Sequence, residues 1–455
     1  MTEQINIRQL VMEMLLAVTK DQEYSHVVIR EVQNKYNYLS VQEKSFMKRL
    51  FEGTLERMIE LDYCIDAYSK VKVNKMKPVI RTIMRMSVYQ ILYMDAVPDS
   101  AACNEAVKLA QKKGFATLKG FVNGVLRNIA RNKENIVYPD REKDYKTYLS
   151  VTYSMPDWII SLWMKQLGKE KTEQVLQGLL QEHPLTIRLR NEEKGVTALK
   201  EALEIQGGYL EEQPYLPYAF RIGKTDDLTR LPGYEEGEFV IQDVSSMLAI
   251  EALNIKPGMK ILDICAAPGG KSILAADKLC GEGCVEARDI SEYKVSLMQE
   301  SFARCGITSP KEIAKAVVWD ALTLDENWIG QADVVIADVP CSGLGVIGKK
   351  RDIKYKMTPQ AVKDIVALQE RILEQAVSYV KPGGKLLFST CTINQEENEA
   401  HAALLQDKYH MTPVSLNDNL PQQLHSETTQ KGYLQLLPGV HDSDGFFISV
   451  FQKNE

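Results

Sequence analysis

Long apolar runs and a secretory leader are both missing from this sequence. The stretch Leu10–Val18 is interrupted by Glu13, and no segment approaches the roughly 20 apolar residues that a membrane-spanning helix needs. Residues Met1–Gln4 do not form a basic segment followed by an apolar block, which a signal peptide would require. We therefore expect a cytoplasmic chain that does not associate with membranes.

Cysteine is also scarce, with 8 residues in 455. This number is too small for a disulfide scaffold, so free thiols in a reducing compartment are expected. Paired Cys-x-x-Cys motifs are lacking, and Cys280 and Cys284 have no partners at a matching spacing. We therefore expect no metal site. Internal repeats and low-complexity tracts are missing as well.

The composition that remains is that of a soluble globular protein, with 45% hydrophobic and 25% charged residues. The net charge of −6 hides an asymmetry, because residues 70–133 carry 13 basic and only 3 acidic residues. Such a block could be a nucleic-acid surface. A solvated helical surface that happens to be basic explains it equally well, so charge alone leaves both interpretations open.

Periodicity divides the chain into three parts. Residues 1–140 are predicted to be all helical, because Val122, Val125, Leu126 and Ile129 recur at helical spacing. Residues 141–235 are predicted to hold linking helices and a small α/β unit. From residue 236 to 455, strands alternate with helices, which predicts a mainly parallel sheet covered on both faces, a Rossmann-like α/β fold.

Ligands of parallel sheets bind outside the carboxyl ends of the strands. The first strand of the C-terminal part, Lys260–Ile264, runs into the small-residue turn Cys265–Lys271. Such a turn before a helix suits a nucleoside triphosphate, a dinucleotide or S-adenosylmethionine. A Walker A loop would need glycine where Cys265 stands, and the dinucleotide spacing Gly-x-Gly-x-x-Gly is absent, so both nucleotide interpretations are weakened.

Two carboxylates follow the next strands, Asp289 and Asp320. A carboxylate after the second strand can accept hydrogen bonds from both ribose hydroxyls. A carboxylate after the third strand can accept a hydrogen bond from an adenine amino group. A single aspartate at a strand end is more often a helix cap. Asp289 and Asp320 together with Asp263 and the glycine-rich turn favour an adenosyl ligand.

Cysteines follow the fourth and fifth strands, Cys341 in Asp338–Gly343 and Cys391 in Ser389–Thr392. A free cysteine is usually a small buried hydrophobic residue. Two thiols at neighbouring strand ends, beside the expected ligand, instead favour chemistry, although the residues alone do not say which would be the nucleophile.

Together these motifs resemble the NOL/NOP/Sun family of RNA cytosine-5 methyltransferases. The turn Cys265–Lys271 is similar to its Cys-Ala-Ala-Pro-Gly-Gly-Lys signature, and Asp338–Ser342 to its Asp-Ala-Pro-Cys-Ser motif. Ser389–Thr392 resembles its Thr-Cys-Ser motif, and Gln242–Ser246 and Gly445–Phe447 resemble two further motifs. Residues 5–135 resemble a NusB-like RNA-binding domain. A NusB-like domain ahead of the methyltransferase domain resembles the arrangement in bacterial small-subunit rRNA methyltransferases.

The resemblance implies methyl transfer from S-adenosylmethionine to carbon 5 of a cytosine in 16S rRNA by a monomeric enzyme. It implies that Cys391 is the nucleophile, that Cys341 assists release and that Asp338 stabilises the base. The cofactor site it implies is Cys265, Ala266, Ala267, Pro268, Gly269, Gly270, Lys271, Asp289, Asp320 and Asp338. It also implies an RNA contact from Arg188, a looser match.

From the basic block we expect phosphate contacts by Lys77, Arg81, Lys112, Lys113, Arg127 and Arg131. The competing class of function is a non-catalytic RNA-binding or ribosome-assembly factor, which the basic helical part would support equally. The two cysteines and the strand-end carboxylates argue for an enzyme. The same chemistry on another RNA remains a further alternative.

Overall fold

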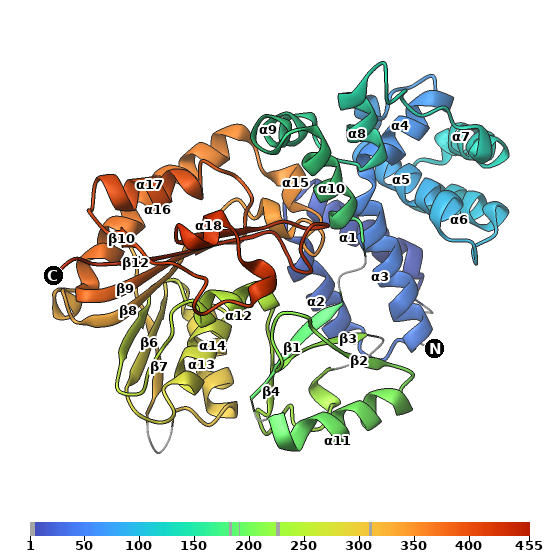
Figure 1. Cartoon of the computed structure of the whole chain (residues 1–455). Coiled ribbons are helices and arrows are strands. Elements are labelled where there is room, and N and C mark those ends of the chain that lie inside the picture. Colours follow the sequence, from blue (N-terminus) through green and yellow to red (C-terminus); the bar gives the residue numbers. More distant parts are fainter. Residues whose placement is uncertain (1–4, 182–183, 191, 224–227, 309–311) are drawn as a thin grey trace. The chain divides into compact units, whose positions relative to one another are not determined.

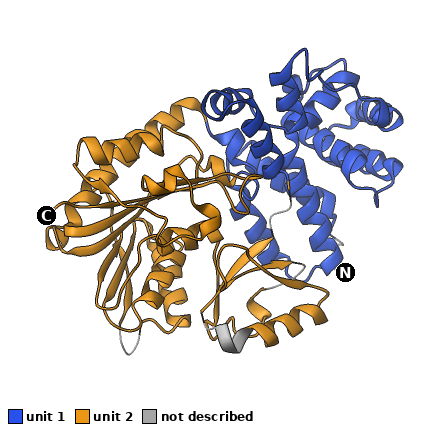
Figure 2. Ribbon diagram, viewed as in Figure 1, with its two compact units in different colours: residues 1–180, 347–357 blue, residues 181–346, 358–455 orange. Residues whose placement is uncertain are grey.

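The chain forms two compact units, each built from segments that are separate in the sequence (Figures 1 and 2). The computed structural model describes residues 5–181, 184–190, 192–223, 228–308 and 312–455. Residues 1–180 and 347–357 make the first unit, and residues 181–346 and 358–455 make the second. The chain therefore passes between the units at three points.

The first unit is helical, as the sequence predicts. Its helices are α1 (Ile7–Thr19), α2 (Ser25–Lys35), α3 (Val41–Glu56), α4 (Met58–Tyr68), α5 (Pro78–Tyr93), α6 (Asp99–Lys112), α7 (Lys119–Asn132), α8 (Tyr145–Thr152), α9 (Asp157–Leu167), α10 (Lys169–Leu179) and α15 (Ile353–Lys356). Local sequence sets their starts: Ser40 and Glu43 form a capping box on α3, and Pro78 occupies the first turn of α5. The predicted apolar face of α7 is buried in one core with α5.

Helices α8–α10, which follow the residues predicted to form the N-terminal domain, belong to the same compact unit, which extends to residue 180. The junction with α4 is made by polar contacts. Ser154 Oγ accepts from the backbone N–H of Ile59 at 2.9 Å, and the Arg57 guanidinium donates to the carbonyl of Thr152 at 3.2 Å. The prediction of linking helices after residue 140 did not anticipate these long-range contacts.

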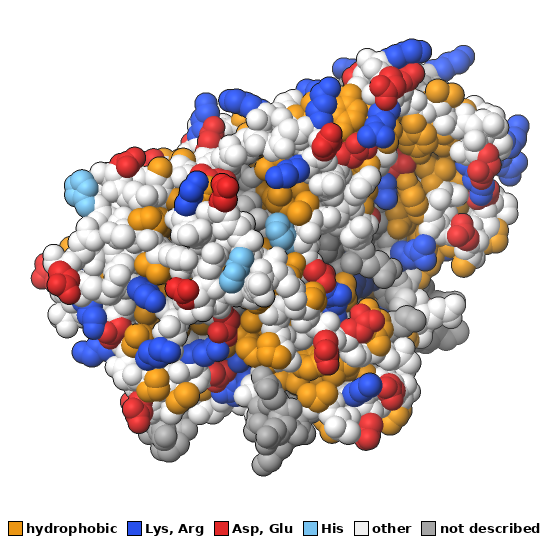
Figure 3. All heavy atoms as spheres, in the orientation of Figure 1, with side chains coloured by type: hydrophobic (Ala, Val, Ile, Leu, Met, Phe, Trp, Pro, Cys, Tyr) orange, Lys and Arg blue, Asp and Glu red, His pale blue; other side chains and the backbone are white. Residues whose placement is uncertain are grey.

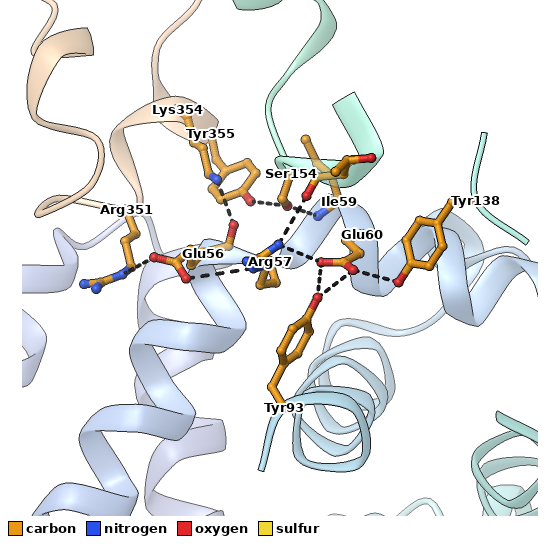
Figure 4. Close-up of polar contacts among 11 residues, drawn as sticks. Glu56, Arg57, Ile59, Glu60, Tyr93, Tyr138, Ser154, Arg351, Lys354 and Tyr355 are labelled. Atoms are coloured by element: carbon orange, nitrogen blue, oxygen red, sulfur yellow. Dashed lines mark hydrogen bonds and ion pairs between the residues drawn. The ribbon is translucent and has the colours of Figure 1, made fainter. Parts of the chain in front are cut away.

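The segment 347–357 is the other unexpected member of the helical unit. Figure 4 shows Arg351 and Lys354 directed toward Glu56 at the end of α3. Arg351 Nε lies 3.0 Å from the Glu56 carboxylate, and Lys354 Nζ donates to the Glu56 carbonyl at 2.7 Å. Asp352 accepts from the backbone N–H of Ser25 at 3.1 Å. These bonds join residues about 300 positions apart, which no local pattern can reveal.

The second unit contains two sheets. The smaller is antiparallel, with strands β1 (Leu185–Leu189), β2 (Tyr209–Glu212), β3 (Ala219–Gly223) and β4 (Phe239–Ile241) in the order β2-β3-β1-β4, accompanied by α11 (Glu192–Ile205). It corresponds to the small α/β unit predicted before residue 235, except that β4 lies beyond that residue. Ile187, Phe220 and Leu203 are among the residues that form its core.

The larger sheet is the expected mainly parallel one. Its order is β10-β12-β9-β8-β5-β6-β7, with β11 paired to β12. The strands are β5 (Lys260–Asp263), β6 (Cys284–Asp289), β7 (Ala314–Val318), β8 (Ala332–Asp338), β9 (Val380–Thr390), β10 (Thr412–Pro413), β11 (Tyr433–Leu436) and β12 (Phe446–Gln452). Strands β9, β8, β5, β6 and β7 run parallel to one another, and β12 pairs antiparallel with β9.

Helices cover both faces of this sheet. They are α12 (Val244–Glu251), α13 (Gly270–Lys278), α14 (Glu292–Arg304), α16 (Pro359–Tyr379), α17 (Glu399–Asp407) and α18 (Glu427–Gln430). Met298 and Phe302 of α14 belong to one buried cluster, and Ile372 and Leu373 of α16 to another. The two clusters confirm the predicted arrangement and leave the carboxyl ends of the strands to carry the polar side chains.

Candidate active site

The parallel strands bring the sequence-predicted residues to one edge of the sheet. In the pairing register, Asp263 of β5 lies opposite Ile336 of β8, and Asp338 of β8 lies opposite Ser389 of β9. Because β9, β8, β5 and β6 are neighbours in that order, the turns that follow them share the carboxyl edge. The glycine-rich turn, the carboxylates and both cysteines are therefore assembled by the sheet.

The turn between β5 and α13 is held by backbone bonds. Ala266 N–H donates to the Arg288 carbonyl at 2.7 Å, which ties the turn to the neighbouring strand β6. Gly269 has φ of +100°, and a Cβ there would lie 3.1 Å from Phe302. The left-handed conformation and the crowding both require glycine at this position. Helix α13 begins at the next residue and presents its N-terminus to the same edge.

Two buried side chains beside this turn each have one polar atom without a hydrogen-bond partner. Ser272 Oγ donates to Asp263 Oδ2 at 2.6 Å, while Asp263 Oδ1 has no hydrogen bond, and burial raises the pKa of Asp263 to about 7. Gln242 Nε2 is also unpartnered, and a Cβ on Gly270 would touch Gln242 at 3.5 Å. Buried polar atoms are normally satisfied, so these two fit a site that receives a polar ligand.

Asp289 and Asp320 end up as the sequence suggested, at consecutive strand ends. One oxygen of each carboxylate accepts a backbone N–H, from Ser291 at 3.0 Å and from Leu322 at 2.9 Å. Each therefore acts as a local turn cap. The other oxygen of Asp289, Oδ2, lies 3.7 Å from Lys294 Nζ, which leaves it lone pairs to accept a further hydrogen bond. Ile290, directly after Asp289, is 67% exposed, which places an apolar side chain beside the carboxylate.

Asp338 joins the glycine-rich turn to the cysteine-bearing strands. Its carboxylate accepts from Lys271 Nζ at 2.7 Å and from Ser389 Oγ at 2.9 Å. Lys271 Nζ also lies 5.1 Å from the centroid of the Phe446 ring. The ammonium group is thus held between a carboxylate and an aromatic face, and Asp338 has a fixed position.

The two cysteines are in direct contact, with 3.1 Å between Cys341 Sγ and Cys391 Sγ. Both are partly buried. The neighbouring Cys391 thiol, burial and the charge of Glu397 raise the pKa of Cys341 well above its ordinary value. Cys341 therefore stays protonated at neutral pH and can donate its S–H to the Cys391 sulfur.

Sequence reasoning missed several side chains that hold this edge together. Glu397, Asn398 and Gln369 are fully buried and bond to the turns that carry the cysteines. Gly345 and Gly445 meet through their backbones, because Gly445 N–H donates to the Gly345 carbonyl at 3.0 Å. The only signal in the sequence was that Gly445 lies in one of the recognised motifs.

Family models and curated relatives cover this chain nearly completely. The model described as 16S rRNA methyltransferase RsmB/F matches residues 250–452, the NusB family matches residues 5–131, and the ferredoxin-like domain of RsmF/B-like methyltransferases matches residues 155–229. The probable ribosomal RNA small subunit methyltransferase B of Bacillus subtilis (strain 168) is 34% identical over 451 residues, covering 98% of this chain and 99% of that protein.

The chain belongs to the RsmB/F family of 16S rRNA methyltransferases. This membership makes it an S-adenosylmethionine-dependent rRNA methyltransferase. Ribosomal RNA small subunit methyltransferase B of Klebsiella pneumoniae subsp. pneumoniae is 28% identical, covering 100% of this chain and 99% of that protein. The resemblance drawn from the motifs is thereby confirmed.

Solved structures support the same fold. The crystal structure of PH0851 matches with a TM-score of 0.81 at 23% identity, covering 99% of both chains. NSun6 from Pyrococcus horikoshii, solved with SFG, matches with a TM-score of 0.57 at 21% identity, covering 66% of this chain and 98% of its own. At these identities the two structures show the fold of this RsmB/F family member.

The placement of Arg188 contradicts the expected RNA contact. The side chain is 2% exposed, and its guanidinium donates to Asp277 at 2.7 Å and to Gln242 at 3.0 Å. Arg190, beside it on the chain, also pairs with Asp277, at 2.6 Å. Arg188 instead anchors β1 to α13 and holds the side chain of Gln242 beside the glycine-rich turn.

The basic residues expected to bind RNA lie in the helical unit. Lys77, Lys112, Arg127 and Arg131 are exposed, Arg81 is partly buried, and Lys113 pairs with Glu13 at 2.8 Å. On the face drawn in Figure 3, Lys and Arg side chains are interspersed with Asp and Glu side chains over this unit. Four of the six residues predicted to contact RNA phosphates are therefore exposed to solvent.

Within the ranges that the structure describes, no group of three or more His, Cys, Asp or Glu side chains is arranged to hold a metal ion. In the same ranges, no helix is both long and apolar enough to cross a membrane.

Proposed function

We propose that this methyltransferase acts on carbon 5 of a cytosine in 16S rRNA, through a covalent bond between Cys391 and the base. The observation that carries the proposal is the pair of thiols 3.1 Å apart, next to a carboxylate fixed by Lys271 and Ser389. Carbon 5 of cytosine is a poor nucleophile, and a thiolate that adds to carbon 6 is the chemistry that activates it. A single thiol could serve only the addition to carbon 6. Two thiols allow one to perform the addition and the other to assist the release.

The cofactor supplies an electrophilic methyl group bound to a sulfonium. The residues that would hold it are the turn 265–271, Asp289, Asp320 and Asp338. Asp289 Oδ2, which lies 3.7 Å from Lys294 Nζ, can still accept from ribose hydroxyls, and the exposed Ile290 offers an apolar surface to an adenine ring. The unpartnered atoms of Asp263 and Gln242 are suited to the amino and carboxylate groups of the methionine part.

The chain's own residues then perform addition and elimination. Cys391 as thiolate forms a bond to carbon 6, and electron density moves to carbon 5, while Asp338 interacts with the ring near nitrogen 3. After methyl transfer the proton on carbon 5 passes to a water molecule, and the electrons of that C–H bond restore the double bond between carbons 5 and 6. The bond between Cys391 Sγ and carbon 6 breaks in the same step, so that Cys391 leaves as a thiolate. To reach these groups the base must leave its stack in the RNA.

The assignment of roles to the cysteines follows the family resemblance and is supported by their environment. The raised pKa of Cys341 keeps its proton in place. A protonated Cys341 beside Cys391 can donate a hydrogen bond to a thiolate there, which stabilises the charged form. The family resemblance makes Cys391 the nucleophile, and the same hydrogen bond to the departing Cys391 thiolate suits Cys341 to assist the release step.

We further propose that the enzyme acts as a cytoplasmic monomer and that the helical unit holds 16S rRNA through phosphate contacts. The supporting observation is the set of exposed cations on α6 and α7, with Lys112, Arg127 and Arg131 among them. Such contacts position the RNA without reading its sequence.

The cysteine roles are tested by trapping. Cys391→Ala should lose methylation and form no covalent complex, because no thiolate remains to attack carbon 6. Cys341→Ala should still attack and transfer the methyl group, and then stall with RNA attached, which gives a denaturant-resistant complex on a gel. Bisulfite sequencing of the same 16S rRNA locates the modified cytosine.

The opposite trapping pattern, with RNA retained by Cys391→Ala, would reverse the two assignments. Normal turnover by Cys341→Ala without trapped RNA would show that Cys341 has only a packing role. A methylated position other than carbon 5 of cytosine would refute the proposed chemistry. Cys280→Ala, at an exposed cysteine away from the strand ends, is the matched control.

A further inference from the structure

Glu397 is a fully buried carboxylate in the turn between β9 and α17. Its Oε1 accepts from the backbone N–H of Ser342 at 2.8 Å and from Gln369 Nε2 at 3.3 Å. Its Oε2 accepts from Ser342 Oγ at 2.5 Å and from Asn394 Nδ2 at 3.1 Å. A buried carboxylate that is bonded this completely has a fixed position and holds its donors in place.

The donors lie next to the two thiols. Ser342 directly follows Cys341, and Thr392 directly follows Cys391. Since a carboxylate only accepts, the Ser342 hydroxyl donates to Glu397, and the Thr392 hydroxyl then donates to Ser342 Oγ at 2.9 Å. Thr392 Oγ1 also lies 3.5 Å from Glu397 Oε2. One carboxylate thereby links the residues that follow the two cysteines.

The residues before the cysteines are held by the same group of side chains. Gln369 Nε2, which bonds to Glu397, also donates to the Pro340 carbonyl at 2.9 Å. Asn398, adjacent to Glu397, accepts from Thr390 Oγ1 at 2.5 Å and donates to the Thr392 carbonyl at 3.1 Å. Each thiol-bearing turn is thus fixed on both sides of its cysteine.

We infer that Glu397 is a positioning residue that sets the contact between the Cys341 and Cys391 sulfurs. This inference rests on the proposed two-thiol chemistry for its catalytic meaning, but the geometry it describes can be measured without turnover. The carboxylate also faces Cys341 closely enough that its charge helps to raise the pKa of that thiol. Glu397 therefore fixes where Cys341 lies and adds to the rise in the pKa of its thiol.

Glu397→Gln is the sharpest substitution because it keeps the shape and removes only the charge and one acceptor. In either orientation of the amide, its NH₂ group must face a donor. On one side the donor is the Ser342 backbone N–H, and on the other it is Asn394 Nδ2. The network must therefore break at one of the two turns. Glu396→Gln, at the exposed neighbour, is the matched control.

The experiment uses the full-length protein and diamide as a two-electron oxidant. Diamide removes one proton and one electron from each thiol, so that an S–S bond forms between Cys341 and Cys391 while diamide is reduced to its hydrazine. Peptide mass spectrometry measures the initial rate of this particular bond. We expect wild type and Glu396→Gln to react equally and Glu397→Gln to react at least tenfold more slowly.

A second readout is the pH profile of Cys341 alkylation by iodoacetamide. Without the carboxylate charge the profile should move to lower pH in Glu397→Gln, which a merely structural role would not produce. Methyl transfer should fall about 100-fold in kcat with KM for RNA changed less than threefold. Affinity for S-adenosylmethionine should be unchanged, which shows that the fold is intact.

A wild-type oxidation rate and an unshifted alkylation profile in Glu397→Gln would overturn the inference. If that variant does not fold, Ser342→Ala is the second test, because it removes the short bond from the Ser342 hydroxyl to Glu397 and leaves Thr392 only its 3.5 Å contact with the carboxylate. An unchanged oxidation rate in Ser342→Ala would also overturn the inference. Failure of the wild type to oxidise at this pair would refute the geometry itself. Because oxidation needs no RNA, failure of the proposed methylation chemistry would be recognised separately.

Discussion

At the scale of single residues, Asp338 is where the two halves of the candidate site meet. Lys271, from the glycine-rich turn, and Ser389, two residues before Cys391, both donate to its carboxylate. The cofactor side and the cysteine side are therefore tied to the same group. A displacement of Asp338 would disturb both the cofactor side and the cysteine side. A substitution of Asp338 would therefore not separate cofactor binding from catalysis.

Asp289 is the better residue for testing cofactor binding alone. Asp289→Ala should lose two charge-assisted hydrogen bonds to ribose hydroxyls, each worth roughly 1.5–3 kcal/mol. Calorimetry with S-adenosylmethionine should therefore show at least a tenfold weaker affinity. Glu292→Gln, which removes a nearby exposed charge on α14, controls for long-range electrostatics. Equal affinity of a folded Asp289→Ala variant would remove Asp289 from the site.

At the scale of elements, the segment 347–357 is the most unusual part of the chain. It begins five residues after Ser342, yet it belongs to the helical unit. Lys354 is buried within it, and desolvation lowers the pKa of its ammonium group to about 7. A buried lysine with a carbonyl partner at 2.7 Å makes the stability of this segment depend on pH.

Lys354 should make the helical unit more stable as the pH rises from 7 to 9. In the unfolded chain the side chain keeps its proton up to about 10.5, whereas in the folded chain it loses the proton near 7. The unfolded state therefore binds more protons over this range, and the free energy of unfolding should rise by about 2 kcal/mol. Below pH 7 Lys354 is protonated in both the folded and the unfolded state, so its contribution to the free energy of unfolding no longer changes with pH.

Hydrogen exchange of α3 and α4 amides in urea, measured between pH 6 and 9, checks this expectation. Lys354→Met removes the titrating group and should remove the rise. Lys350→Met, at an exposed lysine of the same segment, should keep it. A rise of the same size in Lys354→Met would assign the pH dependence to other groups.

At the scale of the whole molecule, our proposal places RNA binding in the helical unit and catalysis in the second unit. If α6 and α7 hold RNA through phosphates, Lys112→Glu, Arg127→Glu and Arg131→Glu combined should weaken binding about equally for unrelated RNA sequences. The slope of log K against log salt should shrink by about 0.7 for each lost contact, as for single strands. Filter binding of the full-length protein at several salt concentrations measures both effects.

The control for this experiment is Lys408→Glu, which reverses an exposed charge on the second unit. It should leave the salt slope unchanged. If the triple variant binds RNA as the wild type does, with the same slope, the basic block is only a solvated surface. The alternative that charge composition left open would then be the correct one.

The sequence by itself was sufficient for features that local patterns encode. Apolar residues at helical spacing predicted α7, and alternating strands and helices predicted the parallel sheet, because burial of one face imposes those periods. The glycine-rich turn and the cysteine motifs were recognisable because their spacing along the chain is short. Strand-end carboxylates such as Asp289 could be grouped because parallel strands place their carboxyl ends together.

Only the tertiary structure decided which side chains surround those motifs. Glu397 bonds to Ser342, 55 positions away, and Arg188 pairs with Asp277, 89 positions away. Alternation in a five-residue strand says that one face is buried, but it does not say that a buried arginine meets an aspartate there. The segment 347–357 likewise joined the helical unit through Asp352 and Lys354. Such partners depend on packing between distant segments, which local periodicity does not contain.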